Sequence, residues 1–291
     1  MSHPELAEAF AQYFISDQGF ASIVEARRFA ESVLGEPVRP GTALAKAVDE
    51  SIEAAVVRAG RWWVQQSSTT HDTYDRLVDL LQRQPNLSVR SSTSVLQQAY
   101  STPIPIAYLA SSLARIDRTT TVYEPTAGNG ALLIGANPDN VIANELNQDR
   151  YTELSTRGFQ HLTQEDALSF QPHAQVDVVI CNPPFGSVKN EQFHTRRFPM
   201  ADTWTTQVDQ VIALKALSVM KPDGRAVLIL GGKKGKEEYI RSERYNTRES
   251  RAFYYLLYQH YRVTQHFSVW GDLYRKQIGR ASCRERVCHR V

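Results

Sequence analysis

A run of strand-forming residues at 178–181 stops abruptly on an amide, two prolines and an aromatic ring: Asn182, Pro183, Pro184 and Phe185. The Asn182 side-chain oxygen and the Pro183 carbonyl are neutral acceptors for N–H groups. Pro184 restricts Pro183 to an extended conformation and fixes its own φ, so the carbonyl has a preset direction. Phe185 adds a flat face on which a planar ring can stack. A plain strand-ending turn is the simpler interpretation of the same four residues.

A second group of polar and small residues follows an expected strand at 120–124 and begins at Glu124. Gly128 and Gly130 let the backbone turn tightly and approach a ligand closely. Leu133 replaces the third glycine of a dinucleotide fingerprint, and Glu124 would repel a pyrophosphate. Glu145 ends the next expected strand and can accept both hydroxyls of a ribose. The pattern favours a ligand with a ribose and a cationic amine but no phosphate.

These residues belong to a region of alternating strands and helices that begins at about residue 119. Such alternation predicts a doubly wound parallel sheet, which binds ligands at the carboxyl ends of its strands. Helices are expected at 147–157, with an N-cap asparagine and a glycine stop, and near 208–219, closed by residues 221–224. The expected strands are 120–124, 141–145, 161–163, 176–181, 226–230 and, further on, 263–269.

The chain before this region is predicted to be helical. Leu6, Phe10, Tyr13 and Phe14 recur at helical spacing, and further amphipathic stretches follow up to about residue 84. No catalytic constellation stands out there.

Composition narrows the class of protein. The chain has 291 residues, of which 42% are hydrophobic and 22% charged, which is typical of a soluble protein. No apolar run approaches the roughly 18 residues of a membrane helix, and the start is not a signal peptide. We therefore expect a cytoplasmic protein without membrane contact. The eight histidines show no metal-ligand spacing, so no metal site is expected.

Taken in order, the motifs resemble those of S-adenosylmethionine-dependent amino-methyltransferases. The segment Ser101-Thr102-Pro103, upstream of the first strand, is similar to the motif that precedes the fold in adenine-N6 DNA methylases of the gamma arrangement. The resemblance covers residues 95 to 277. It implies a Rossmann-like class I methyltransferase sheet and S-adenosylmethionine as cofactor. The cofactor-binding residues that it implies are Thr102, Pro103, Glu124, Thr126, Gly128, Asn129, Gly130, Glu145 and Asp166.

Within the cofactor site, the resemblance places Thr102, Pro103 and residues 128–130 around the methionine part, Glu145 at the ribose and Asp166 at the adenine amino group. Asn182, Pro183, Pro184 and Phe185 are then the catalytic residues. An adenine amine is a poor nucleophile because its lone pair is delocalised into the ring. The two acceptors of this motif can hold its N–H groups, and Phe185 can stack on a base extruded from double-stranded DNA.

Other acceptors stay open, because motifs of this kind also serve glutamine side chains in proteins and bases in RNA. The prefix at Ser101 favours DNA adenine. A further alternative is an inactive module that binds DNA or scaffolds a larger complex. The helical start, residues 84–103 and residues 271–277 are also similar to the methylase portion of phage-type proteins that join a methylase to a strawberry-notch-like helicase. Such proteins are linked with protection of DNA from restriction, which makes a C-terminal helicase region a possible partner.

Two basic segments are candidate phosphate contacts. One is Arg196-Arg197, in the segment after Phe185, and the other is the run from Gly231 to Glu237. The second lacks the spacing and the Ser/Thr of a phosphate loop. Solvated loops explain both equally well.

The last residues, 278–291, match nothing before them and resemble the translation of a sequencing-adapter oligonucleotide. We expect three parts: a helical region at 1–90, a methyltransferase domain at 91–277 and an artefactual tail. A sheet of this class returns through a seventh, antiparallel strand between the fifth and sixth. If the tail is set aside, the sheet lacks that strand, and a fragment of marginal stability is expected.

Overall fold

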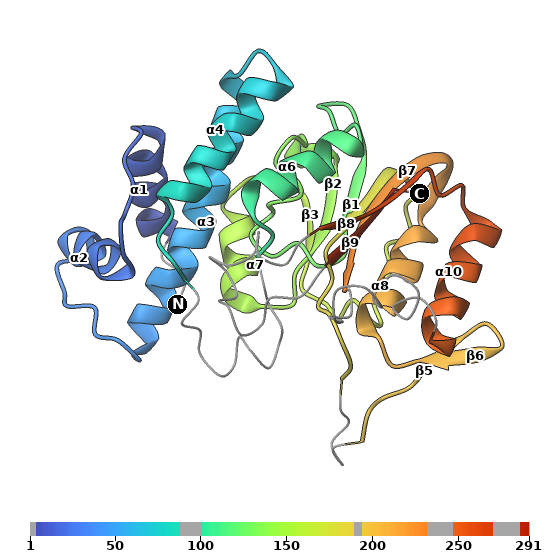
Figure 1. The fold of residues 1–291 in the computed structure, drawn as a ribbon. Coiled ribbons are helices and arrows are strands. Elements are labelled where there is room, and N and C mark those ends of the chain that lie inside the picture. Colours follow the sequence, from blue (N-terminus) through green and yellow to red (C-terminus); the bar gives the residue numbers. More distant parts are fainter. Residues whose placement is uncertain (1–3, 88–100, 189–193, 232–246, 270–285, 291) are drawn as a thin grey trace, which may run out of the picture.

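The computed structural model describes residues 4–87, 101–188, 194–231, 247–269 and 286–290 (Figure 1). Four helices lie within residues 4–87, as the periodicity predicts. They are α1 (Pro4–Ile15), α2 (Ile23–Leu34), α3 (Ala43–Gln66) and α4 (Thr70–Arg83). Ser22, Thr42 and Thr69 cap α2, α3 and α4, because each side-chain oxygen accepts a backbone N–H of the first turn. None of the described helices is long and apolar enough to cross a membrane.

The large sheet follows these helices. Its strands are β1 (Val122–Glu124), β2 (Val141–Asn144), β3 (His161–Thr163), β4 (Val176–Cys181), β7 (Met220–Gly231), β8 (Gln265–Val269) and β9 (Arg286–Arg290). Their order is β3-β2-β1-β4-β7-β9-β8, and the first five are parallel. The remaining elements are α6 (Ile104–Leu113), η1 (Pro138–Asn140), α7 (Gln148–Ser155), the antiparallel pair β5 (Phe198–Met200) and β6 (Thr203–Thr205), α8 (Val208–Leu217) and α10 (Arg248–His260).

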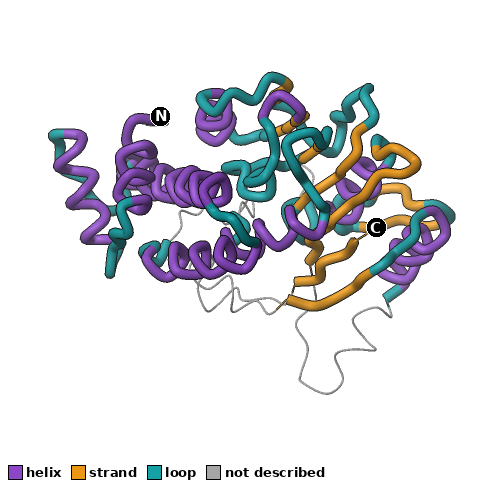
Figure 2. The backbone as a smooth tube through the Cα atoms, turned by 90° about the horizontal axis from the view of Figure 1, so that it is seen from above, coloured by secondary structure: helices purple, strands orange, loops and turns teal. Residues whose placement is uncertain are grey.

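The central parallel strands β1 and β4 are buried on both faces, and β4 shows how. Val178 and Ile180 pack in the core that contains α1, α3, α4 and α6. Val179 and Cys181 point to the other face, into the core under α8 and α10. This alternation follows from the two-residue period of a strand. Figure 2 shows the same arrangement from above, with the N-terminal helices beside the strands.

The expected strands and helices are confirmed with small shifts of their ends. Asn147 caps α7, and Gly158, with φ of 78°, lies beyond its end. The largest difference is at β7, which begins at Met220 instead of 226. Residues 221–224 were expected to close a helix, but they form an irregularity inside the strand, where the register with β4 shifts between Val176 and Val178.

The expectation that the sheet lacks its seventh strand is wrong. Residues 286–290 form β9, which lies antiparallel between β7 and β8. Val287 pairs with Leu230 on one side and Ser268 on the other. The tail shows no hydrophobic pattern, but a strand flanked by two others needs only backbone groups to complete both ladders. The artefactual origin of the tail stays a prediction.

The N-terminal helices and the sheet share one apolar core. One connected cluster of buried side chains includes Leu6 of α1 and Ile229 of β7. Gly60 of α3 is a point of close approach, because a Cβ there would lie 2.9 Å from the Ile104 side chain of α6 and 3.0 Å from that of Ile134. Helix α3 therefore packs directly against the elements that carry the site.

Candidate active site

A cavity of about 460 Å³ lies at the carboxyl ends of β1, β2 and β4, the edge where the fold predicts a ligand. Most residues singled out in the sequence line it. They are Thr102, Glu124, Thr126, Gly128, Asn129, Glu145, Asp166, Asn182, Pro184 and Phe185. Pro103, Gly130 and Pro183 do not line the cavity, although each is adjacent in the chain to a residue that does.

The glycine loop after β1 has the backbone that its sequence predicts. Gly128 and Gly130 have φ of 57° and 71°, a region that other residues rarely adopt. A Cβ on Gly130 would also lie 3.1 Å from the Leu154 side chain of α7. The loop is fixed to the next strand, since Ala127 donates its N–H to the carbonyl of Asn144 at 2.9 Å.

Glu145 is buried directly after β2, and backbone groups hold both of its carboxylate oxygens. Gly128 donates its N–H at 2.7 Å, and Asn147 donates its N–H at 2.8 Å. A carboxylate can accept about four hydrogen bonds. Glu145 therefore keeps capacity for two further donors while the backbone fixes its orientation.

Asn144 is a structural residue of the site that the sequence did not reveal. Its amide donates to the carbonyls of Pro125, at 3.0 Å, and Glu165, at 2.8 Å. Its side-chain oxygen accepts from the Thr163 hydroxyl at 2.7 Å and the Glu165 N–H at 3.0 Å. One buried side chain thus joins the loops that follow β1 and β3.

Glu124 ends β1 with 2% of its surface exposed, and its Oε2 has no hydrogen-bond partner among the described residues. Burial, and secondly the nearby charge of Glu145, raise the pKa of this carboxyl well above its usual range, while Arg157 opposes the rise. A positive charge in the cavity would reverse this effect and favour the ionised carboxylate.

Asn182 follows β4, and its amide is held in one orientation. Its Nδ2 donates to the Thr102 hydroxyl at 2.7 Å. Its Oδ1 is buried and accepts no hydrogen bond within the described part of the chain. The structure thus brings the predicted catalytic amide into contact with a residue that the sequence assigned to cofactor binding, 80 positions earlier.

Phe185 lines the cavity and is half-buried against the end of β7. Three of its atoms, including Cβ and Cγ, lie 3.1 Å from the place that a Cβ on Gly231 would occupy. The N–H of Gly231 is anchored to the Asp209 carboxylate of α8 at 2.9 Å. The Phe185 ring can therefore occupy this position only because residue 231 is a glycine, which has no Cβ.

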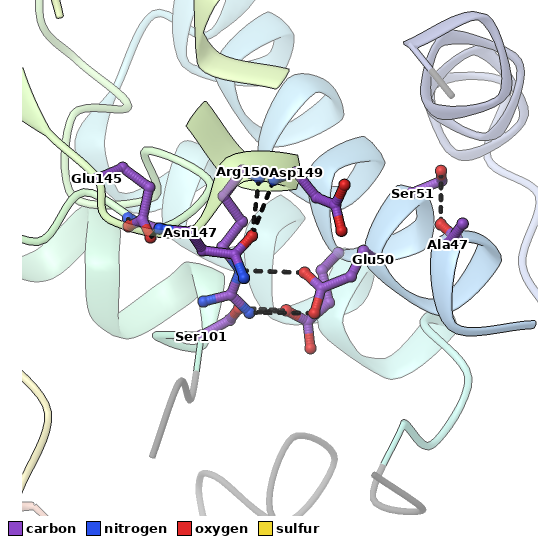
Figure 3. Close-up of polar contacts among 10 residues, drawn as sticks. Ala47, Glu50, Ser51, Ser101, Glu145, Asn147, Asp149 and Arg150 are labelled. Carbon is purple, nitrogen blue, oxygen red and sulfur yellow. Dashed lines mark hydrogen bonds and ion pairs between the residues drawn. The ribbon is translucent and has the colours of Figure 1, made fainter. Parts of the chain in front are cut away.

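An ionic network connects the cavity to helix α3, as Figure 3 shows. Arg150 of α7 is 6% exposed, lines the cavity and donates to Glu50 at 3.0 Å and to Glu53 at 3.3 Å. Glu53 also accepts from the hydroxyl of Ser101, the residue before Thr102. Burial alone would lower the pKa of Arg150, but these acids raise it above the ordinary arginine value. The cation is therefore fixed in its charged form.

Asp166 lies on the exposed side of the cavity, and its Oδ1 accepts the N–H of Leu168 at 2.9 Å.

Arg157 donates to the Asn129 carbonyl at 2.5 Å behind the glycine loop, and burial lowers the pKa of this arginine to about 10. The described residues hold no group of three or more potential metal ligands.

No protein-family model and no curated protein sequence matches this chain. Solved structures with a similar fold include a putative class I S-adenosylmethionine-dependent methyltransferase of Listeria monocytogenes. It is 11% identical, with a TM-score of 0.47, over 99% of this chain and 88% of that one. A Thermoplasma acidophilum protein is 18% identical, with a TM-score of 0.39, over 68% and 94% of the two chains. A methyltransferase of Thiobacillus denitrificans, solved with S-adenosyl-L-homocysteine, is 12% identical, with a TM-score of 0.38, over 65% and 78%.

The order and direction of the strands define the fold independently of these structural similarities. Five parallel strands followed by an antiparallel strand inserted between the fifth and the last is the arrangement that the sequence motifs imply for a class I methyltransferase sheet.

Proposed function

We propose that this protein transfers the methyl group of S-adenosylmethionine to the N6 amine of adenine in DNA. The observation that carries the proposal is the state of Asn182. Its amide nitrogen donates to the Thr102 hydroxyl, while its oxygen is buried beside the cavity with no partner among the described residues. An N–H group of a bound substrate is the partner that such an oxygen lacks.

The cavity fits the cofactor in volume and in charge. Its 460 Å³ falls within the roughly 300–1,000 Å³ of small-molecule sites. Four lining residues hold buried polar atoms that have no partner among the described residues: Glu124, Thr126, Asn129 and Asn182. Each such atom costs about 1–3 kcal/mol, so their concentration in one place indicates a missing ligand. Glu124 suits a ligand that carries a sulfonium and an amine.

Residues of four segments would hold the cofactor. We assign the glycine loop and Thr102 to its methionine part, Glu145 to its ribose hydroxyls and Asp166 to its adenine amino group. The geometry agrees with the second assignment, because two backbone N–H groups already orient the Glu145 carboxylate.

When bound, S-adenosylmethionine would supply a methyl group activated by a positively charged sulfur. The amine nitrogen would gain the methyl and lose one proton to water, and the sulfur would keep the electron pair of its former bond. The chain's own task is to prepare the nitrogen. Asn182 Oδ1 and the Pro183 carbonyl accept the two amine N–H groups, which draws the nitrogen toward a pyramidal geometry. Both acceptors are neutral, so no ionised base is required.

Phe185 supplies a ring against which an extruded adenine stacks, since an amine inside a duplex is out of reach. Phe185 and Asn182 line the same cavity, so a base stacked on the ring would enter the space that the Asn182 acceptor borders. Transfer then depends mainly on alignment of nitrogen, carbon and sulfur.

Labelled methyl transfer to unmethylated DNA, RNA and protein tests the proposal. We expect label on adenine in DNA, and a decrease of about 10²–10³-fold in kcat for Asn182→Ala, as for removal of other groups that stabilise a transition state. Gln160→Ala, which removes an exposed amide outside the cavity, is the matched control. Label on protein or RNA alone would replace DNA as the acceptor. Unchanged DNA methylation by Asn182→Ala would refute the mechanism.

A further inference from the structure

The segment between Phe185 and α8 leaves the sheet and returns beside the cavity. Gly186 accepts the N–H of Val208 through its carbonyl at 2.8 Å, which ties the two ends of residues 187–207 together. Both residues at this tie line the cavity. The β5–β6 hairpin lies within this segment and projects at one edge of the molecule (Figure 1).

The two faces of the hairpin differ in character. Phe198 and Met200 of β5 are buried, whereas Pro199 is exposed and pairs with Trp204 of β6, which is 36% exposed. Arg196 and Arg197 lie directly before β5, and Arg196 also lines the cavity.

Both arginines are exposed, and each is stacked on an aromatic ring. The Arg196 guanidinium carbon lies 4.8 Å from the centre of the Phe198 ring, and that of Arg197 lies 4.2 Å from the Trp204 ring. Stacking uses the flat face of the guanidinium. The N–H donors lie in its plane, so they stay available at the edge for a bidentate acceptor such as phosphate.

The described residues around the hairpin carry more arginines than acids. Helix α10 begins beside β6, where the Thr206 hydroxyl contacts the Glu249 carboxylate at 3.3 Å, and it adds the exposed Arg248 and Arg251. Within the described hairpin and the first turn of α10, the acidic residues are Glu249 and Asp202, which lies in the turn of the hairpin.

We propose that the hairpin face, defined as Arg196, Arg197 and Trp204, binds the DNA strand that carries the target base. This inference rests on the proposed function. A base that enters the cavity stays attached to its strand, so the strand must cross the rim, where Arg196 lies. Arg196 and Arg197 contact its phosphates, and a flanking base stacks on the Arg197–Trp204 pair.

Equilibrium binding of a short fluorescent DNA duplex at several salt concentrations tests the phosphate contacts. Each phosphate contact contributes about 0.9 to the slope of log K against log salt. We expect the double variant Arg196→Gln/Arg197→Gln to lose about 2 from this slope. The control Arg28→Gln/Arg39→Gln removes two exposed arginines that do not line the cavity, one in α2 and one five residues after its end, and should keep the slope. Figure 1 shows α2 on the opposite side of the molecule from β5 and β6.

Trp204→Ala tests the stacking contact separately. We expect its Kd for single-stranded DNA to rise by about 5- to 150-fold, the loss that one stacked base causes. The salt slope should stay unchanged because no charge is removed, and Trp204→Phe should bind nearly as the wild type does. Circular dichroism of each variant verifies that it is folded.

The result that overturns the inference is a wild-type salt slope in Arg196→Gln/Arg197→Gln, an equal loss of slope in the control pair, or no binding of DNA by the unaltered chain. The proposed function fails in a different way. If the unaltered chain binds DNA through this face but transfers no methyl to adenine, the hairpin inference stands and the reaction does not. If the unaltered chain methylates adenine and the arginine variants bind DNA as tightly and with the same salt slope, the proposed reaction stands and the hairpin inference fails.

Discussion

Replacement of Thr102 by valine removes one hydroxyl and leaves the shape of the side chain nearly unchanged. That hydroxyl accepts the Asn182 Nδ2–H at 2.7 Å, so the Asn182 oxygen, which has no partner among the described residues, is kept as an acceptor. In Thr102→Val the same amide orientation leaves a partly buried N–H donor without its partner. Turning the amide over would present donors, instead of an acceptor, to the substrate amine.

The size of the effect follows from that buried donor. An unsatisfied buried polar group costs about 1–3 kcal/mol, so the productive orientation becomes rarer and kcat should fall by about 5- to 150-fold. Thr102→Ser keeps the hydroxyl and should retain most of the activity. Asn182→Ala should lose more than Thr102→Val, because it removes the acceptor itself.

Single-turnover transfer of labelled methyl, together with calorimetric binding of S-adenosylmethionine, distinguishes this role from a cofactor contact. If Thr102 acts through Asn182, the double variant Thr102→Val/Asn182→Ala should be no slower than Asn182→Ala alone. The reasoning is refuted if Thr102→Val keeps its kcat and only weakens cofactor binding, or if the two losses simply add.

Two further predictions concern the walls of the cavity. Because burial raises the pKa of Glu124, the folded protein binds more protons than the unfolded chain above the pH at which a free glutamic acid titrates. Its free energy of unfolding should therefore fall as pH rises through that window, and urea unfolding of Glu124→Gln should show a flatter pH dependence; equal slopes would contradict the shift. Gly231→Ala places a methyl group 3.1 Å from Phe185 atoms; displacement of the ring costs about 1–3 kcal/mol, and kcat should fall, whereas an unchanged kcat would exclude a role for the ring position.

The sequence predicts the site wherever one local pattern determines it. A run of β-branched residues that ends at two prolines places Asn182 at the end of a buried strand. Two glycines with positive φ place the loop next to Glu145. These features depend on neighbouring residues, so position and type are sufficient to infer them.

Contacts between distant segments were not predictable in this way. Glu53 belongs to an amphipathic helix, where an acidic residue is ordinary, yet it binds Ser101 and Arg150, which lie 48 and 97 positions away. Likewise, residues 286–290 carry no strand pattern, and only the space between β7 and β8 makes them a strand. The spacing of side chains along the sequence predicts neither contacts between distant segments nor a strand that forms only between two others.

The ion pairs of Arg150 bear on how far the protein can be shortened. A chain trimmed to begin at Ser101 would keep every strand and Thr102 but lose Glu50 and Glu53. The Arg150 guanidinium would then lie at the wall of the cavity without these two counter-charges, where it would repel a cationic sulfonium. The smallest active enzyme should therefore include α3, a helix with no part in the chemistry itself.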